Sequence, residues 1–239
     1  MTRGAHGNSL TLESAAELLA AVRWANASRA RVIVLASDGG PWCVGGDLRD
    51  FEKAPDRATH IDDLAEALHR VVSELTRSDA IVVAAVDGVA AGAGMPLAAA
   101  ADIVVASERA RFTLGYTRIG LTPDGGTSLL ATTVGLHRML RLALLNPVLS
   151  AREAHELGLV AEVVPVEGLT AAVDTIVAAL TAGPRAALAA TKHLVRNQVA
   201  ADAEAALRRE TLGVRSAAGG AEADEGIAAF LEKRRPRFP

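Results

Sequence analysis

The segment AAGAGMPLAAAAD, Ala90 to Asp102, decides the fold because it places two glycines and a proline between a hydrophobic run and an alanine-rich stretch. Before it, AIVVAAV (residues 80–86) is apolar and rich in valine, which predicts a buried strand. The alanines at 98–101 predict a closely packed helix. A strand, a glycine turn and a helix start direct free backbone N–H groups outward, and such groups attract negative charge. The segment therefore predicts a backbone turn that binds an anion.

The residues around this segment alternate between helical and strand patterns. Apolar residues recur at helical spacing from Leu12 onward, after Asn8 and Ser9, which can cap a helix start. The runs 31–37 and 102–107 are largely apolar, which is typical of parallel strands covered by helices on both faces. The pattern indicates an α/β fold. Further helices are predicted at residues 61–78, 136–145, 150–159, 169–180, 184–212 and 221–234.

The composition argues against nucleic-acid binding. The 239 residues are enough for one large domain with a substantial core. Half of them are hydrophobic but only 3% are aromatic, so little is available to stack on bases. The formal net charge is −3, whereas a nucleic-acid binder usually has a basic excess.

Cysteine and hydropathy patterns favour a reducing, aqueous environment. Cys43 is the single cysteine, so a disulfide framework is excluded, and no Cys/His spacing resembles a metal site. The first ten residues lack an apolar core of signal-peptide length, and the uncharged run 88–101 is too short to span a bilayer. We therefore expect a soluble cytoplasmic protein with no membrane or metal partner.

A second glycine turn, WCVGGDL (residues 42–48), follows the predicted strand 31–37. Neither glycine turn shows the full dinucleotide fingerprint followed by a ribose-binding acid, so a Rossmann interpretation is disfavoured. After residue 111 the chain becomes rich in turn residues, as in GYTRIGLTPDGG (residues 115–126). Loops of this kind commonly carry function when a rigid scaffold holds them.

Taken in order, the motifs resemble the crotonase superfamily, the enoyl-CoA hydratase/isomerase family. The resemblance runs from about Asn8 to the C-terminus and rests on VLAS and WCVGGDL, AAVDGVAAGAGMPLAAAADIVVAS, IGLTPDGGTS, and LSAREAHELGLVAEVV. It implies the α/β crotonase (ClpP/crotonase-like) fold, a spiral of repeated ββα units with a C-terminal helical oligomerisation region. Residues 1–175 would form the core with the active site, and residues 176–239 the trimerisation region of a homotrimer or homohexamer.

The resemblance also implies a coenzyme A thioester as substrate, with its carbonyl bound by the backbone N–H groups of Val44 and Ala93. Proton removal beside a thioester pushes charge onto that oxygen, and losing one preorganised donor typically costs about 2.7 to 4 kcal/mol. Bare glycines let the substrate approach the backbone, although each glycine alone is also explained by a tight turn or close packing. The residues expected to bind substrate are Cys43, Gly45, Gly46, Asp47, Leu48, Gly92, Pro96, Phe230 and Lys233.

The sequence departs from the hydratases of this family at both catalytic glutamates. These positions hold Pro96 and Tyr116, and neither side chain acts as a carboxylate. Tyr116 is a candidate proton donor but a poor base at neutral pH. Hydration by the family's usual route is therefore not expected.

Asp124, in TPDGG, stands where some isomerases of the family place a catalytic aspartate. One carboxylate is sufficient for a double-bond shift, because it removes a proton from one carbon and returns it at another. The alternative is that Asp124 caps the following helix, since Pro-Asp-Gly-Gly is also a strong turn sequence.

We therefore expect an enoyl-CoA isomerase of the type used in fatty acid metabolism, with Asp124 as acid/base and no permanently bound cofactor. Coenzyme A would enter only as part of the substrate. Two alternatives stay open: another lyase or hydrolase reaction on the same scaffold, with Tyr116 as donor, and an acyl-CoA-binding subunit without catalysis.

Overall fold

The computed structural model describes residues 1, 6–199 and 202–238. Seven strands and eleven α-helices, with two short 3₁₀ helices, are named in these ranges. The strands are β1 (Val32–Leu35), β2 (Ile81–Val86), β3 (Val89–Ala91), β4 (Ile103–Ser107), β5 (Arg111–Thr113), β6 (Leu149–Ser150) and β7 (Glu162–Val164). The α-helices are α1 (Leu12–Ala27), α2 (Leu48–Lys53), α3 (Arg57–Arg77), α4 (Gly94–Ala99), α5 (Thr127–Val134), α6 (Leu136–Leu145), α7 (Ala151–Glu156), α8 (Leu169–Ala182), α9 (Arg185–Val199), α10 (Ala203–Ala218) and α11 (Ala221–Leu231), and the 3₁₀ helices are η2 (Tyr116–Ile119) and η3 (Val166–Gly168).

The strands form two sheets. The first has the order β1-β2-β4-β7 and is parallel throughout, which confirms the parallel arrangement predicted from the apolar runs. In the second, β3-β5-β6, β3 and β5 are parallel while β5 and β6 are antiparallel. β2 ends two residues before Gly88 and β3 begins one residue after it, so the chain passes from the first sheet to the second at that glycine, whose φ is +83°.

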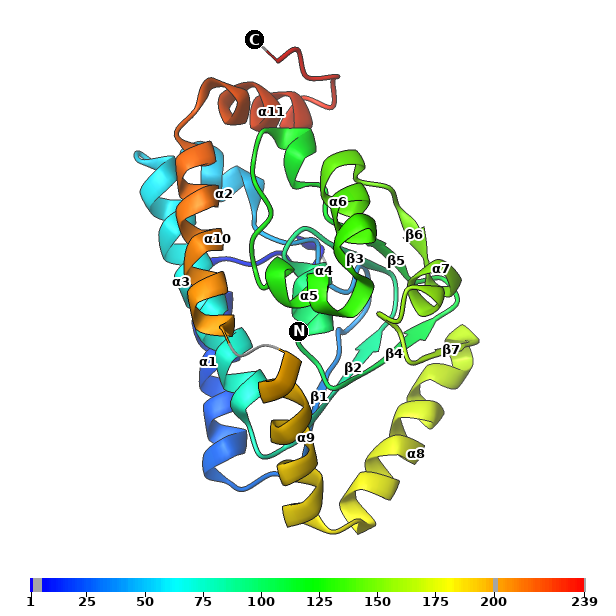
Figure 1. The fold of residues 1–239 in the computed structure, drawn as a ribbon. Helices are drawn as coiled ribbons and strands as arrows, with labels where there is room; N and C mark the ends of the chain where they lie inside the picture. The colour runs from blue at the N-terminus through cyan, green and yellow to red at the C-terminus, as the bar shows by residue number, and fades with distance from the viewer. Residues whose placement is uncertain (2–5, 200–201, 239) are drawn as a thin grey trace.

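Helices cover both faces of the first sheet, as expected from its continuous burial. All six residues of β2 are buried. On one face, Val83 and Val105 pack against Val173 of α8. On the other, the long helix α3 buries its apolar stripe in the main core and packs along both α1 and α10 (Figure 1). The C-terminal helix α11 lies against η2 and α2, at the top of Figure 1.

Several expected helix boundaries were wrong: α3 begins at residue 57 rather than 61, α7 ends at residue 156 rather than 159, and α4 covers residues 94–99 rather than 98–101. Thr11, rather than Asn8 or Ser9, caps α1, in a reciprocal capping box with Ser14. The helix expected at 184–212 is divided into α9, which ends at residue 199, and α10, which begins at residue 203. The last helix ends at residue 231 rather than 234.

Within the described ranges, none of the helices has by itself the length and apolar character needed to cross a membrane. One bent pair, Val166–Ala182 with Arg185–Gln198, meets that criterion when taken together.

Candidate active site

The two glycine turns lie side by side. The Cys43 N–H donates to the Val89 carbonyl at 3.0 Å, and the Ala91 N–H donates to the Cys43 carbonyl at 2.8 Å. These bonds hold the turn at 44–46 against the turn at 92–94. The predicted pairing of the two turns is therefore present.

Glycine is required on both sides of this contact. A Cβ on Gly94 would lie 2.2 Å from the Cys43 carbonyl oxygen, which no relaxation of a flexible side chain can relieve. Gly45 has φ of +85°, a conformation that other residues rarely adopt. The close backbone contact between the turns thus depends on these two residues.

The two N–H groups expected to bind the thioester oxygen differ in whether they already donate a hydrogen bond within the protein. The Ala93 N–H has no acceptor among the residues that the structure describes, so it is available to a ligand. The Val44 N–H donates to the Gly7 carbonyl at 3.2 Å. A ligand could therefore bind the Ala93 N–H directly, whereas at Val44 it would have to replace the Gly7 carbonyl.

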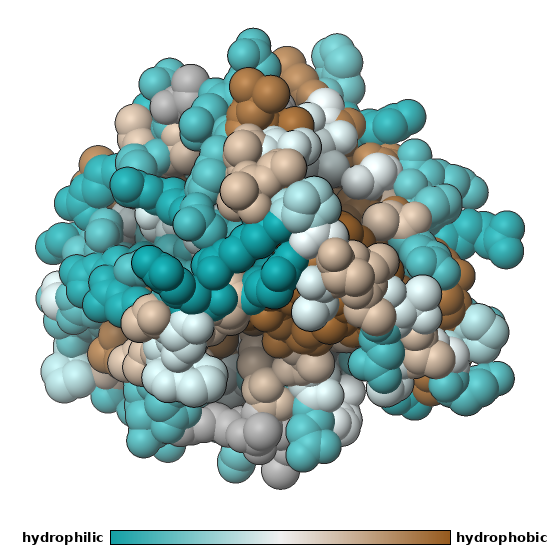
Figure 2. Space-filling view, turned by 90° about the horizontal axis from the view of Figure 1, so that it is seen from below, coloured by the Kyte–Doolittle hydropathy of each residue, from teal (hydrophilic) through white to brown (hydrophobic). Residues whose placement is uncertain are grey.

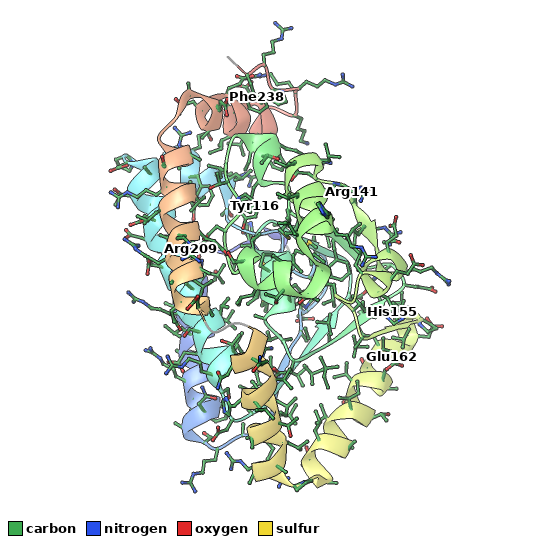
Figure 3. All side chains as sticks on the ribbon, viewed as in Figure 1. Tyr116, Arg141, His155, Glu162, Arg209 and Phe238 are labelled. Carbon is green, nitrogen blue, oxygen red and sulfur yellow. The ribbon has the colours of Figure 1, made fainter. Side chains whose placement is uncertain are left out.

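A cavity of about 280 Å³ opens beside both turns. It is largely apolar, and Val44 and Ala93, whose backbone N–H groups are the expected donors, are among its lining residues. A larger hollow of about 690 Å³ lies elsewhere, beside His155 and Glu162, which are neighbours at the edge of the molecule in Figure 3. We place the candidate site at the smaller cavity, whose lining residues are Val44, Gly46, Leu48, Phe51, Ala91, Gly92, Ala93, Thr113, Leu114, Gly115, Tyr116, Arg118, Ile119, Leu121 and Phe230.

Several expected substrate-binding residues are not among those that line this cavity. Cys43 is fully buried, and burial raises the pKa of its thiol to about 11, so it is neither an exposed nor an activated nucleophile. Asp47 caps α2 by accepting the Arg49 N–H, and it also accepts the Ser9 hydroxyl. Pro96 lies buried in the first turn of α4. Lys233 follows α11 and is exposed.

Phe230 lines the cavity of its own chain, although 61% of its surface is exposed. It comes from α11, which packs on η2 and α2. An apolar ring at the rim of an apolar cavity is typical of a small-molecule site.

Tyr116 lies in the interior of the molecule (Figure 3) and is among the residues that line the cavity. Its hydroxyl donates to the backbone carbonyl of Asp124 at 2.9 Å. Burial, and then the charges of Asp124 and Glu210, raise the tyrosine pKa well above its ordinary value. Tyr116 therefore does not act as a base here, and its O–H ties the cavity wall to the Asp124 turn.

Asp124 is buried and lies behind this wall. Its Oδ1 is 2.9 Å from Nε2 of His69, which is also buried. Asp124 is not among the described residues that line the cavity. The next residue, Gly125, lies against Ala93, since a Cβ on Gly125 would be 3.1 Å from that of Ala93. The carboxylate is thus near the second oxyanion turn and paired with a histidine.

The alternative role of Asp124 as a helix cap is wrong, because another residue fills it. α5 begins after Gly126 without a side-chain cap from its own segment. Glu210 of α10 accepts the N–H groups of Gly126 at 2.9 Å, Thr127 at 3.1 Å and Ser128 at 2.5 Å. A carboxylate from a distant helix therefore satisfies the N-terminus of α5.

His69, Asp124 and Glu210 form a buried cluster that the sequence interpretation missed. Burial acts to lower the pKa of His69, but the contact with Asp124 and the charges of Glu210 and Glu66 outweigh it, so that pKa is raised. Burial raises the pKa of Glu210 despite the hydrogen bonds from Ser128 and Gly126. The one signal in the sequence was a histidine inside the otherwise apolar stripe of α3.

The same three side chains have the composition of a metal site, with ligand atoms all within 4.8 Å of one another. The donor atoms are already engaged by protein groups, however. Glu210 accepts three backbone N–H groups, and Nδ1 of His69 lies 3.0 Å from the Thr211 hydroxyl. We therefore interpret the cluster as an ion-pair network.

A parallel sheet joined to a second small sheet, two apposed glycine turns with backbone donors and an apolar cavity beside them define a crotonase-type α/β enzyme. A model of the family described as enoyl-CoA hydratase/isomerase matches residues 1–239, and the chain belongs to this family. It is thus an enzyme of a family that processes acyl-CoA thioesters.

Individual relatives carry both isomerase and hydratase names. The chain is 36% identical over 214 residues to 1,2-epoxyphenylacetyl-CoA isomerase of Escherichia coli strain K12, covering 87% of this chain and 80% of that protein. It is 38% identical over 232 residues to a protein of Rhodobacter capsulatus named "Probable enoyl-CoA hydratase", covering 97% and 89%. The crystal structure of an enoyl-CoA hydratase from Mycobacterium avium subsp. paratuberculosis K-10 superposes with a TM-score of 0.91 at 34% identity, covering 100% of this chain and 93% of that one.

Proposed function

We propose that this enzyme is an enoyl-CoA isomerase that shifts a carbon–carbon double bond of an acyl-CoA thioester, with Asp124 as its single acid/base. The observation that carries the proposal is the position of Asp124. Its carboxylate is buried, and the adjacent Gly125 packs on Ala93 of the oxyanion turn. The two positions at which the family's hydratases carry glutamate hold Pro96 and Tyr116.

The thioester carbonyl oxygen would accept a hydrogen bond from the Ala93 N–H and, once the Gly7 carbonyl is displaced, from the Val44 N–H. Negative charge that develops on this oxygen is then stabilised by donors that need no reorganisation during the reaction. The acyl segment next to the thioester would occupy the apolar cavity between Leu48, Leu114 and Phe230.

The proton shift then needs one acid/base group. The Asp124 carboxylate removes a proton from one carbon of the allylic system, the electrons move onto the thioester oxygen, and the protonated acid returns the proton at another carbon. Because the Asp124 side chain does not line the described cavity, this step requires a local shift when substrate binds. Catalytic contacts commonly tighten only in the substrate complex.

The proposal is tested by offering the purified enzyme a 2-enoyl-CoA and a 3-enoyl-CoA and following both double-bond migration and water addition. We expect migration without hydration, and its loss in Asp124→Asn. The matched control is Asp79→Asn, because Asp79 also pairs with a histidine, His193, but on the surface. Hydration of the 2-enoyl substrate at ordinary hydratase rates would contradict the proposal.

A second candidate, an acyl-CoA-binding subunit without catalysis, is favoured by the bond between the Val44 N–H and the Gly7 carbonyl. That bond withholds one oxyanion donor. The candidate predicts that coenzyme A thioesters bind while neither enoyl substrate reacts, so the same assay with a binding measurement separates the two.

We further propose that the chain assembles as a homotrimer or homohexamer. Apolar side chains are exposed on α6 and α9, among them Leu136, Leu144, Leu145 and Leu194. Apolar surface also gathers in the middle of the face seen in Figure 2, surrounded by polar side chains. Exposed apolar surface of this kind commonly marks an interface. Analytical ultracentrifugation at micromolar concentration tests the assembly, and a monomer would contradict it.

A further inference from the structure

We propose that His69 is a positioning residue, which anchors the Asp124 carboxylate behind the cavity wall, in the position from which it moves to the reacting carbons when substrate binds. This inference rests on the proposed function, because it assigns His69 a role in the reaction of Asp124. His69 itself does not line the substrate cavity in the described structure. It acts through Asp124 and has no contact with the reacting atoms.

Oxygen atoms lie close to both ring nitrogens of His69, as an ion pair without hydrogen-bond geometry at Nε2 and as a hydrogen bond at Nδ1. Nε2 lies 2.9 Å from Oδ1 of Asp124, and Nδ1 lies 3.0 Å from Oγ1 of Thr211. The Thr211 hydroxyl donates to the Leu207 carbonyl one turn earlier in α10. Its oxygen is therefore free to accept from Nδ1–H, which fixes the ring with Nε2 beside the carboxylate.

The charges around the ring favour its protonated form. Asp124 faces Nε2, Glu210 of α10 lies 3.9 Å away from the same nitrogen, and Glu66 comes from one turn earlier in α3. Glu66 is paired with Arg208 of α10, so the negative charge of Glu66 is partly offset by that arginine. Tyr116, the remaining titratable neighbour of Asp124, is held neutral by burial. An imidazolium ring between two buried carboxylates offsets charge that would otherwise be costly to bury.

His69 also borders a hollow that is separate from the substrate cavity. His69 lines a hollow of about 510 Å³ on the outer side of α3, together with Glu66, Arg70 and Ser73. This hollow and the substrate cavity share no lining residue. A thioester in the cavity therefore does not fill the hollow beside His69.

In the proposed reaction His69 keeps its own proton throughout. Asp124 receives the substrate proton and returns it, and the imidazolium only holds the carboxylate in place between turnovers. As pH rises through the raised pKa of His69, the ring loses its charge, and we expect kcat to fall with it.

The test compares His69→Gln with the wild type, because glutamine retains a side-chain donor but never titrates. We expect kcat for 3-enoyl-CoA isomerisation to fall about 100-fold while KM stays about the same, since misplacing a reacting group can cost that much. The alkaline fall of kcat should disappear in this variant. The matched control is His193→Gln, which removes the surface partner of Asp79 and should change neither kcat nor its pH profile.

A second measurement follows the His69 ring by nitrogen-15 NMR in the wild type and in Asp124→Asn. We expect the ring to stay protonated above its ordinary range in the wild type and to lose protons at lower pH in the variant. An unchanged titration, or a His69→Gln enzyme with the wild-type pH profile, would overturn the inference. If the wild-type enzyme isomerises no enoyl-CoA, the proposed function is overturned. This result is distinct from failure of the inference, because the titration of the His69 ring still reports its ion pair with Asp124.

Discussion

A Cβ on Gly45 would lie 3.0 Å from the backbone nitrogen of Ala93, the group that is available to bind the thioester oxygen. The two turns are therefore so close that position 45, which faces the Ala93 N–H, has no room for a side chain. Adding a methyl group at position 45 therefore tests the role of the Ala93 N–H.

Gly45→Ala should lower kcat/KM by about 100-fold, the effect of losing one oxyanion donor. The added methyl group would press on Ala93 and displace its N–H. Gly39→Ala is the matched control, because Gly39 also has positive φ, +66°, but a Cβ there meets nothing within 4 Å. Steady-state kinetics of both variants checks the prediction, and equal losses would show that backbone strain alone is responsible.

Glu210→Ala should lower the free energy of unfolding by about 3 kcal/mol, because three N–H groups at the start of α5 would lose their acceptor. Urea denaturation measures this change. Glu204→Ala is the control on the same helix, since the Glu204 side chain is 65% exposed. Its effect should stay within about 0.5 kcal/mol. Similar losses in the two variants would contradict the capping role.

The stability of the protein should fall as pH rises above about 6.5, the ordinary value for histidine. Because the pKa of His69 is raised in the folded state, its ion pair contributes fully below the unfolded value and is lost as pH rises through the folded one. The pKa of Glu210 is also raised in the folded state, so its contribution to stability is likewise lost as pH rises, beginning at a lower pH than that of His69. Urea midpoints at pH 6 and pH 9 measure the slope, which should be smaller in His69→Gln. A slope of opposite sign would exclude the assignment.

Cys43 should resist thiol reagents in the native protein. Its side chain is fully buried and burial raises its pKa to about 11, so both access and thiolate formation are suppressed. Labelling with a chromogenic disulfide at pH 8 should become fast only in denaturant. Rapid labelling of the native enzyme would place Cys43 at the surface.

The local features of this fold could be predicted from the sequence, because short patterns determine them. The apolar runs predicted parallel strands, and the glycines at 45 and 94 predicted two bare turns whose contact the structure contains. The capping of α1 was misplaced by a few residues, since Asn8, Ser9 and Thr11 are all good caps and only the folded chain selects Thr11.

The supporting part of the site could not be predicted, because it joins residues that are distant in the chain. His69 and Thr211 are 142 positions apart, and nothing in either segment indicates the other. The carbonyl of Gly7 on the Val44 N–H is likewise a tertiary contact. Even Asp124, which sequence patterns did single out, needed the structure to show that another residue caps α5.

The contact between Glu210 and the start of α5 also has a consequence for protein synthesis. The N–H groups of residues 126–128 find their acceptor 82 to 84 positions later in the chain. When residues 124–128 leave the ribosome, Glu210, whose carboxylate accepts the N–H groups of residues 126–128, has not yet been synthesised. The sheet can form while translation continues, but the turn that carries the proposed acid/base is completed only when α10 emerges, so activity is acquired near the end of translation.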